Sequence, residues 1–295
     1  MKKLLLALLF AVSAHAETLK IIVPYAPGGN TDLTARLIAK ELSAQNIDAV
    51  VVNKPGAEGL VGQNDLLTQR PDGNTVLFTG SGGIIYNSLA SVQNYDKMRQ
   101  LIPVARMTIT GQFLLTKRDN KIKTWAQLQE AVKTRTVSIG TNSGIMRAMV
   151  QELFPNNPNI IVVPFNSDAQ AMTALLSGTI DVATVTFVYE NNVAAGELNA
   201  LAVTTETGRF GVKSLKELGT GVSKEQWYGF FLPPNTPTDI RNRLALMFNT
   251  VKQSPELDRA IRTSIHAVLS KTVTPNEFAQ AIEAEYRKLL PTYNK

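Results

Sequence analysis

The sequence predicts an α/β protein with two α/β domains, a hinge, and a ligand cleft between them. Apolar runs of strand length are each followed by a glycine-rich corner and then by a helical segment, and this order recurs at βαβ spacing. The chain has 295 residues, a length that is natural for two domains. Because no Gly/Ser-rich linker occurs, we expect ordered hinge strands near 104–116 and 221–231.

The first 16 residues have the pattern of a cleavable signal peptide. Lys2 and Lys3 precede a short apolar run over 4–12, and Ala14-His15-Ala16 supplies the cleavage site before Glu17. The apolar run is too short to span a bilayer, and no cysteine follows it to carry a lipid anchor. We therefore expect an exported protein of 279 residues.

Composition excludes several classes of function. The chain has 30 basic and 24 acidic residues, and loss of the two leader lysines leaves 28 against 24, a net charge of +4. These charges are scattered, so nucleic-acid binding is not indicated. Cysteine is absent, and His266 is the only histidine after the leader. A multi-histidine metal site is impossible and a Ser-His-Asp triad would have to use His266, so we expect no enzyme activity and no cofactor.

The elements of the first domain follow from local patterns. Thr18–Val23 is apolar enough for a buried strand, and 31–43 is rich in Leu and Ala and begins after two glycines, which favours a helix. Pro71-Asp72-Gly73 marks a turn. The same reasoning predicts strands over 48–52 and 75–78 and a helix over 60–69.

The second unit repeats this order over about 100 residues, starting with a helix over 125–132 that Thr124 caps. Ser177-Gly178 ends a later helix. The expected strands are 136–139, 160–163, 180–186 and 200–203, and the other helices are 145–153 and 169–176.

The last third begins with an apolar strand over 227–232 and continues as helices. Thr274, Pro275 and Glu277 form a capping box with proline at the first helical position of the final helix. We expect these helices to return to the first domain, which then comprises 17–115 and 226–295, with 116–225 as the second domain. The two intervening helices are expected over 238–252 and 255–263.

Four polar corners follow predicted strands: 26–32, 79–83, 141–144 and 166–168. Ligands of open α/β sheets bind at the carboxyl ends of strands, and helix N-termini favour anions. Any one corner alone is most simply a turn. Because two corners come from each unit, together they favour an anion site in a cleft.

The residues at these corners support a catalytic site less well than they support an anion-binding site. None matches G-x-G-x-x-G or a P-loop. The segment 79–83 is not a nucleophile elbow, because Thr79 stands where that motif needs glycine. Asp32 could serve as a general base, but an acid in the first turn of a helix more often stabilises the helix start. Arg36 and Arg147 each fit a solvated helix face better than a ligand contact.

The sequence resembles the Bug/TctC family, the periplasmic solute-binding components of tripartite tricarboxylate transporters. The matching motifs run in order over nearly the whole mature chain. They are VPYAPGGNTDLTAR at 23–36, VNKPGAEG at 52–59 with Gly62, PDGNTVL at 71–77, LSGTID at 176–181, LAVTT at 201–205 with Arg209, WYGFFLPPNTP at 227–237 and TPNEF at 274–278.

This resemblance implies a type II periplasmic-binding-protein fold, a Venus flytrap that closes over a small carboxylate: a di- or tricarboxylate, an acidic amino acid or a related organic acid. It implies a periplasmic protein, expected as a monomer, that delivers ligand to integral-membrane permease subunits. One carboxylate would be held by Ala26, Pro27, Gly28, Gly29, Asn30, Thr31 and Asp32, and the opposing positions are Gly80, Ser81, Ser143, Gly144 and Thr186.

Two corners of the second domain depart from the family pattern. PFNSDAQA at 164–171 stands where the family usually has a basic residue and a glycine, and TNSG at 141–144 replaces a more glycine-rich loop. Asp168 would disfavour a highly charged ligand unless it points away from the cleft. An alternative function, a periplasmic sensor that presents the ligand to a receptor kinase, would use the same pocket.

Overall fold

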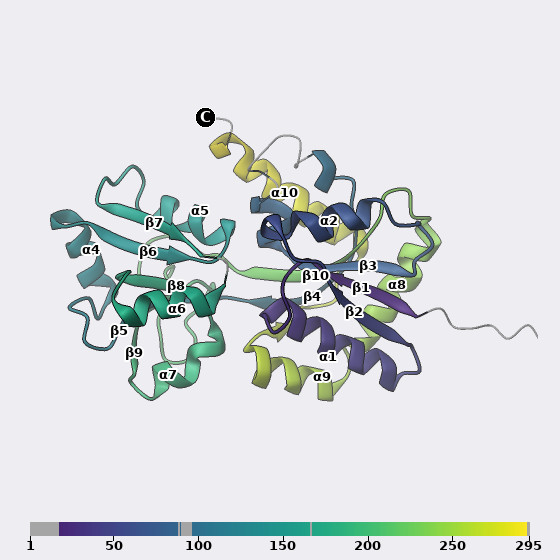
Figure 1. The fold of residues 1–295 in the computed structure, drawn as a ribbon, viewed down its shortest axis with the longest axis horizontal. Coiled ribbons are helices and arrows are strands. Elements are labelled where there is room, and N and C mark those ends of the chain that lie inside the picture. The colour runs from purple at the N-terminus through teal and green to yellow at the C-terminus, as the bar shows by residue number, and fades with distance from the viewer. Residues whose placement is uncertain (1–17, 88, 90–95, 166, 294–295) are drawn as a thin grey trace, which may run out of the picture.

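The computed structural model describes residues 18–293 except 88, 90–95 and 166. It consists of two sheets, each covered by its own helices (Figure 1). We call the six-stranded sheet with its helices the first lobe and the five-stranded sheet with its helices the second lobe. The expected signal peptide, 1–16, lies outside the described residues. None of the described helices is long and apolar enough to cross a membrane.

The sheet of the first lobe is mixed. Strands β1 and β3 are parallel neighbours, and β2 pairs in parallel with the other edge of β1. Strand β10 then runs antiparallel to both β3 and β4. The strand order is β11-β4-β10-β3-β1-β2, with β1 at Leu19–Val23, β2 at Ala49–Asn53, β3 at Thr75–Gly80, β4 at Ile102–Thr110, β10 at Gln226–Leu232 and β11 at Val268–Leu269.

Alternation along these strands gives each face of the sheet its own core. Ile21 packs with helices below the sheet in Figure 1, whereas its neighbour Ile22 packs with those above it. Phe230 stacks on Phe248 at 3.8 Å between ring centroids. The lower helices are α1 (Asn30–Ala44) and α9 (Pro255–Ala260), joined on this face by α8 (Thr238–Val251) and η5 (Ile261–Ile265); the other face carries α2 (Leu60–Leu67), η2 (Gly82–Asn87) and α10 (Pro275–Tyr293).

The second lobe has the same construction. Strand β6 is parallel to β7 and β8, and β5 is antiparallel to β8 and β9. The order is β7-β6-β8-β5-β9, with β5 at Gln112–Lys117, β6 at Val137–Thr141, β7 at Ile160–Pro164, β8 at Val182–Thr186 and β9 at Leu198–Val203. Its helices are α4 (Trp125–Thr134), α5 (Gly144–Leu153), α6 (Asp168–Ser177) and α7 (Glu190–Ala194), with η4 at Phe187–Tyr189.

The chain passes from the first sheet to the second at Gly111, between β4 and β5. A side chain there would collide, because a Cβ atom would lie 2.5 Å from Thr205 Cγ2 and 2.9 Å from Phe187 Cζ. The chain returns along 204–225, where the Thr204 N–H donates to the Gln112 carbonyl at 2.9 Å. Two neighbouring segments therefore connect the lobes. Gly111 lies within the expected hinge region 104–116, whereas the returning segment 204–225 overlaps the expected region 221–231 only at its end.

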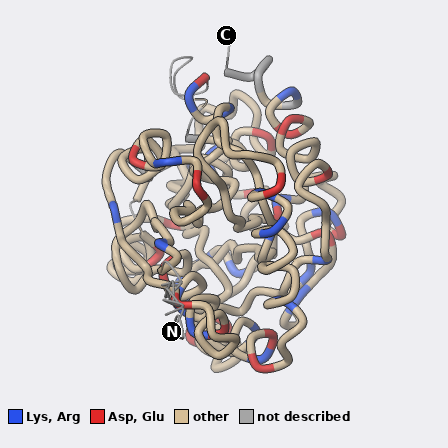
Figure 2. Tube along the Cα trace, turned by 90° about the vertical axis from the view of Figure 1, so that its right-hand side faces the viewer, with Lys and Arg blue, Asp and Glu red and all other residues tan. Residues whose placement is uncertain are grey.

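The expected cap at Thr124 and the expected capping box at Thr274 are present. Thr124 caps α4 reciprocally with Gln127, and the N–H of Glu277 donates to the Thr274 hydroxyl at 3.2 Å while that of Thr274 donates to the Glu277 carboxylate at 2.7 Å. Charged residues of both signs are interspersed over the face shown in Figure 2, as the scattered charges of the sequence predict.

Candidate functional site

The corner after β1 is held by Asp32 in the first turn of α1. The Asp32 carboxylate accepts hydrogen bonds from the N–H of Gly28 at 2.9 Å, from Arg36 Nε at 2.9 and 3.1 Å, and from Asn53 Nδ2 at 2.9 Å. Burial alone would raise the pKa of Asp32, but the hydrogen bonds from Arg36, Gly28 and Asn53 outweigh it and lower the pKa. Asp32 is thus an ionised structural anchor, as the helix-start interpretation expects, and Arg36 is its partner.

Most of the same corner is exposed. Residues 26–29 are exposed, Asn30 is half-buried and Thr31 is buried. No side chain caps α1 at its N-cap residue, Gly29. The amino end of this 15-residue helix therefore offers N–H groups and a partial positive charge.

The corner after β3 is a compact polar nest around Gly83. A Cβ atom on Gly83 would lie 2.6 Å from Tyr25 Oη, 2.8 Å from Gln63 Nε2 and 3.1 Å from Thr79 Oγ1. Within the described part of the chain, Gln63, Thr79 and Ser81 have buried side-chain polar atoms without a hydrogen-bond partner. Such groups cost free energy unless a ligand or water satisfies them, so these three side chains can take part in binding a polar ligand.

The second lobe contributes the corners after β6 and β8. The Ser143 hydroxyl accepts from Gln226 Nε2 at 3.2 Å, and Gly144 begins α5. The Thr186 N–H donates to Asp168 Oδ2 at 3.0 Å, and the Thr186 hydroxyl donates to the same oxygen. Thr186 is therefore committed to Asp168.

The corners of the two lobes meet. A Cβ atom on Gly82 would lie 3.6 Å from Ser143 Cβ, an ordinary van der Waals contact. Gln226 belongs to the first sheet and bonds to Ser143 of the second lobe. Tyr228 in turn donates to Gln226 Oε1 at 3.3 Å. The structure thus brings the predicted residues after β3 and β6 together.

His266 is part of a different contact between the lobes. Its Nδ1 lies 2.8 Å from Glu190 Oε2, and its ring meets Phe210 edge-on with centroids 6.5 Å apart. Neither neighbour supplies the serine hydroxyl that a Ser-His-Asp triad needs. Within the described residues, no group of three His, Cys, Asp or Glu side chains is placed to hold a metal ion.

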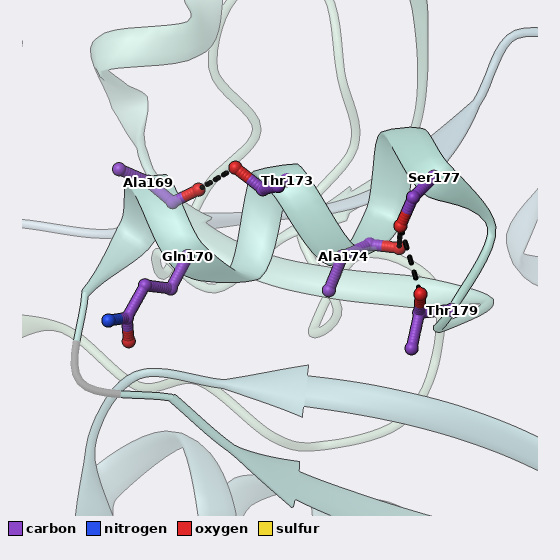
Figure 3. A pocket seen from close by; sticks show the side chains of 6 residues that line it. All are labelled: Ala169, Gln170, Thr173, Ala174, Ser177 and Thr179. Carbon is purple, nitrogen blue, oxygen red and sulfur yellow. Dashed lines mark hydrogen bonds between the residues drawn. The ribbon is translucent and has the colours of Figure 1, made fainter.

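A shallow depression on α6 is a weaker candidate (Figure 3). The Thr173 hydroxyl donates to the Ala169 carbonyl at 2.9 Å, and the Ser177 hydroxyl donates to the Ala174 carbonyl at 3.0 Å. Ser177 also lies 2.9 Å from the Thr179 hydroxyl. These hydroxyls satisfy one another and the helix, so they leave little for a ligand.

Sequence reasoning did not single out five polar residues around these corners. Two patterns in the sequence could have identified them: a polar side chain within or next to an apolar strand, and a polar side chain one turn into a helix that follows a glycine. The five residues are Tyr25, Gln63, Gln112, Gln226 and Tyr228.

Comparison with known proteins identifies the family. A family described as the "Tripartite tricarboxylate transporter family receptor", TctC, matches residues 34–289. The chain belongs to this family. A UPF0065 protein of Bordetella pertussis is 29% identical over 267 residues, covering 84% of this chain and 82% of that protein. Protein BugT of the same organism is 28% identical over 253 residues, covering 81% and 77%.

Solved structures show the same fold for this TctC chain. A structure of a periplasmic transporter superposes with a TM-score of 0.83 at 25% identity, covering 96% of this chain and 98% of that one. MatC from Rhodopseudomonas palustris with bound malate gives 0.79 at 21% identity, covering 94% and 98%. A second R. palustris protein, solved with adipate, gives 0.79 at 23%, covering 94% and 97%. The fold is therefore that of the TctC/Bug periplasmic binding proteins, a family of solute-binding proteins.

Proposed function

We propose that this protein is an extracytoplasmic solute-binding protein that captures a small carboxylate between its lobes for a tripartite tricarboxylate transporter. The observation that carries the proposal is the polar nest after β3, where the Thr79 and Ser81 hydroxyls are buried and have no hydrogen-bond partner within the described residues. It lies next to Gly82, where an added Cβ atom would lie 3.6 Å from Ser143 of the second lobe. A carboxylate needs several converging donors, and backbone and hydroxyl groups supply them. Malate and adipate in the related structures support this ligand class.

The mechanism that we propose is hinge closure. The leader 1–16 directs export to the periplasm. The monomeric mature chain binds ligand in the cleft between its two domains, the first formed by 17–115 together with 226–295 and the second by 116–225. Contacts to both lobes favour the closed arrangement, because a ligand shifts an equilibrium only by its differential affinity for the two states. Membrane permease subunits then receive the ligand. No covalent step is needed.

A thermal-shift panel tests the function. Mature protein is unfolded, dialysed, refolded free of ligand and mixed with mono-, di- and tricarboxylates and amino acids, with the corresponding uncharged amides as controls. At 100 times Kd a ligand stabilises by about 2.7 kcal/mol, which is about 5–10 °C in melting temperature. One class of carboxylates should shift the transition and the amides should not. Absence of a shift with every carboxylate would contradict the proposal.

Bulky replacements test the location of the site. Thr31→Leu and Ser81→Leu each put a large side chain at a predicted ligand-binding position and should abolish binding while circular dichroism shows a folded protein. Ser177→Leu is the control, because Ser177 is exposed on α6. Unchanged affinity in both site variants would show that the ligand binds elsewhere.

A further inference from the structure

The first lobe holds hydrogen-bond donors at the corners after β1 and β3. Asn30 Nδ2 and Ser81 Oγ are both buried, and neither has a partner among the described residues. Asn30 is the first residue of α1, whose N-terminus lacks a side-chain cap. This group of donors is suited to one carboxylate.

The second lobe presents acceptors, the foremost being Asp168 at the start of α6. Asp168 Oδ1 accepts from Asn142 Nδ2, and Oδ2 accepts from the N–H and the hydroxyl of Thr186. All three donors are neutral, and no Lys, Arg or His in the described part of the chain forms an ion pair with Asp168. An ionised carboxylate accepts about four hydrogen bonds, so Oδ1 retains room for a further donor.

A chain of side-chain amides leads away from Asp168. Asn142 turns its NH2 group toward Asp168 and its oxygen toward Gln112. Gln112 Nε2 accordingly donates to Asn142 Oδ1 at 3.1 Å. Gln112 Oε1 is left buried and without a donor within the described structure. The second lobe thus carries two acceptors that await donors, Asp168 Oδ1 and Gln112 Oε1.

The acceptor end and the donor end belong to one cleft. Tyr228 stands opposite Gly80 in the sheet, next to Ser81. Burial, then Tyr25, then the negative charge of Asp168 raise the pKa of Tyr228. Asn142, which donates to Asp168, is followed by Ser143, whose hydroxyl accepts from Gln226 of the first sheet, so Asp168 bonds to the residue next to the contact between the lobes.

Asp168 has little compensation for its charge. Burial raises its pKa and outweighs the hydrogen bonds from Thr186 and Asn142, which lower it. Burial and then Asp168 also raise the pKa of Tyr189 in the same lobe. A cation with N–H donors is the partner that such a carboxylate lacks.

We propose that the ligand is an amino acid with a single carboxylate, whose ammonium group is received by Asp168 while its carboxylate is held by Asn30, Ser81 and the start of α1. This rests on the proposed function, and it narrows the ligand class. A second ligand carboxylate beside Asp168 would be repelled, since like charges in a site of low dielectric disfavour each other. Di- and tricarboxylates should therefore bind about tenfold or more weakly than zwitterions of similar size.

Paired ligands test the proposal on the unmodified mature protein. Each pair differs only in an amine or a hydroxyl: alanine and lactate, leucine and 2-hydroxyisocaproate, phenylalanine and phenyllactate. After the amino acids and their hydroxy-acid partners, the dicarboxylates succinate, malate and adipate form a third series of ligands. Calorimetry should show at least one amino acid bound about tenfold or more tightly than its hydroxy partner and than every dicarboxylate. A dicarboxylate or hydroxy acid that binds as tightly as the amino acids overturns this inference but leaves the proposed function intact. Binding of no carboxylate overturns both.

Asp168→Asn tests the residue itself. The variant keeps the size and one acceptor oxygen but removes the charge, so it should lose the preference for the amine by about tenfold and bind the hydroxy acid at least as well as the parent does. Asp181→Asn is the charge-matched control, because Asp181 pairs with Arg135 and Ser138 instead. An unaltered preference in a folded Asp168→Asn protein overturns the assignment. If that variant fails to fold, the paired ligands on the parent still decide the ligand class.

Discussion

Replacing Gly83 with alanine should fill the polar nest after β3. The new Cβ atom would lie 2.6 Å from Tyr25 Oη and 2.8 Å from Gln63 Nε2, distances that real Cβ atoms essentially never show. At least one of these side chains must move. Gly82→Ala is a matched control one residue earlier, because its Cβ atom would make only a 3.6 Å contact with Ser143.

The change in stability that Gly83→Ala causes is the difference between two opposing effects. Overpacking costs about 1–3 kcal/mol, and Gly83 lies within the helical turn η2, where alanine is favoured over glycine by up to about 1 kcal/mol. The net destabilisation should be about 0–3 kcal/mol, or a fall of up to about 12 °C in melting temperature. Because the displaced groups line the candidate site, ligand affinity should fall by tenfold or more, which is about 1.4 kcal/mol.

Two measurements on each variant decide the matter. Differential scanning calorimetry gives the melting temperature, and isothermal titration gives Kd for the carboxylate that most stabilises the parent protein. Gly83→Ala should change both, and Gly82→Ala should keep Kd within about twofold. Equal affinities for both variants, or a Gly83→Ala protein that binds like the parent, would refute the placement of the ligand at this nest.

Two further predictions concern charge. Asp32→Asn should destabilise the protein by about 1–3 kcal/mol at pH 7, since it removes the ion pair with Arg36 at 2.9 Å. The native pKa of Asp32 is lowered, so this stabilisation is present above the unfolded value of 3.8 and is lost as pH falls through the native pKa. Urea titrations should therefore show the gap between variant and parent closing in strong acid; a constant gap would contradict the ion-pair explanation. Burial, and then the charge of Arg106, lower the pKa of Lys252 to about 8 from 10.5. The native state then binds fewer protons than the unfolded state between these values, so parent stability should rise by about 1–3 kcal/mol from pH 8 to 10.5, and a Lys252→Met protein that showed the same rise would refute this.

Much of the fold could be predicted because local patterns determine it. The glycine corner before Asn30 and the capping boxes at Thr124 and Thr274 need only neighbours in sequence, and the structure contains all three. The prediction of parallel strands is confirmed for β1 with β2 and β3 and for β6 with β7 and β8. The antiparallel pairing of β4, β5, β9 and β10 was not predicted, because their partners are far away in the chain.

The site is predictable only in outline, for the same reason. The sequence marks Ser81 and Ser143 as polar residues at strand ends, but it does not show that a Cβ atom on Gly82 would lie 3.6 Å from Ser143. The bonds of Asp168 to Asn142 and Thr186 join residues 26 and 18 positions apart. Likewise the interaction of Gly83 with Gln63 depends on packing between segments, which a single sequence does not reveal.

The two crossings between the lobes run side by side and are hydrogen-bonded to each other. Thr110 is paired with Gln226 in the first sheet, and Gln112 bonds to Thr204 at the entry to the second. Two paired strands behave as a ribbon, which flexes easily across its flat face and resists bending within its plane. Opening and closing should therefore be a rotation about one axis, so that the same residues of the two lobes face each other each time the protein closes. Gln112, whose side-chain oxygen has no donor within the described residues, follows Gly111 directly and should therefore lie next to the axis of that rotation.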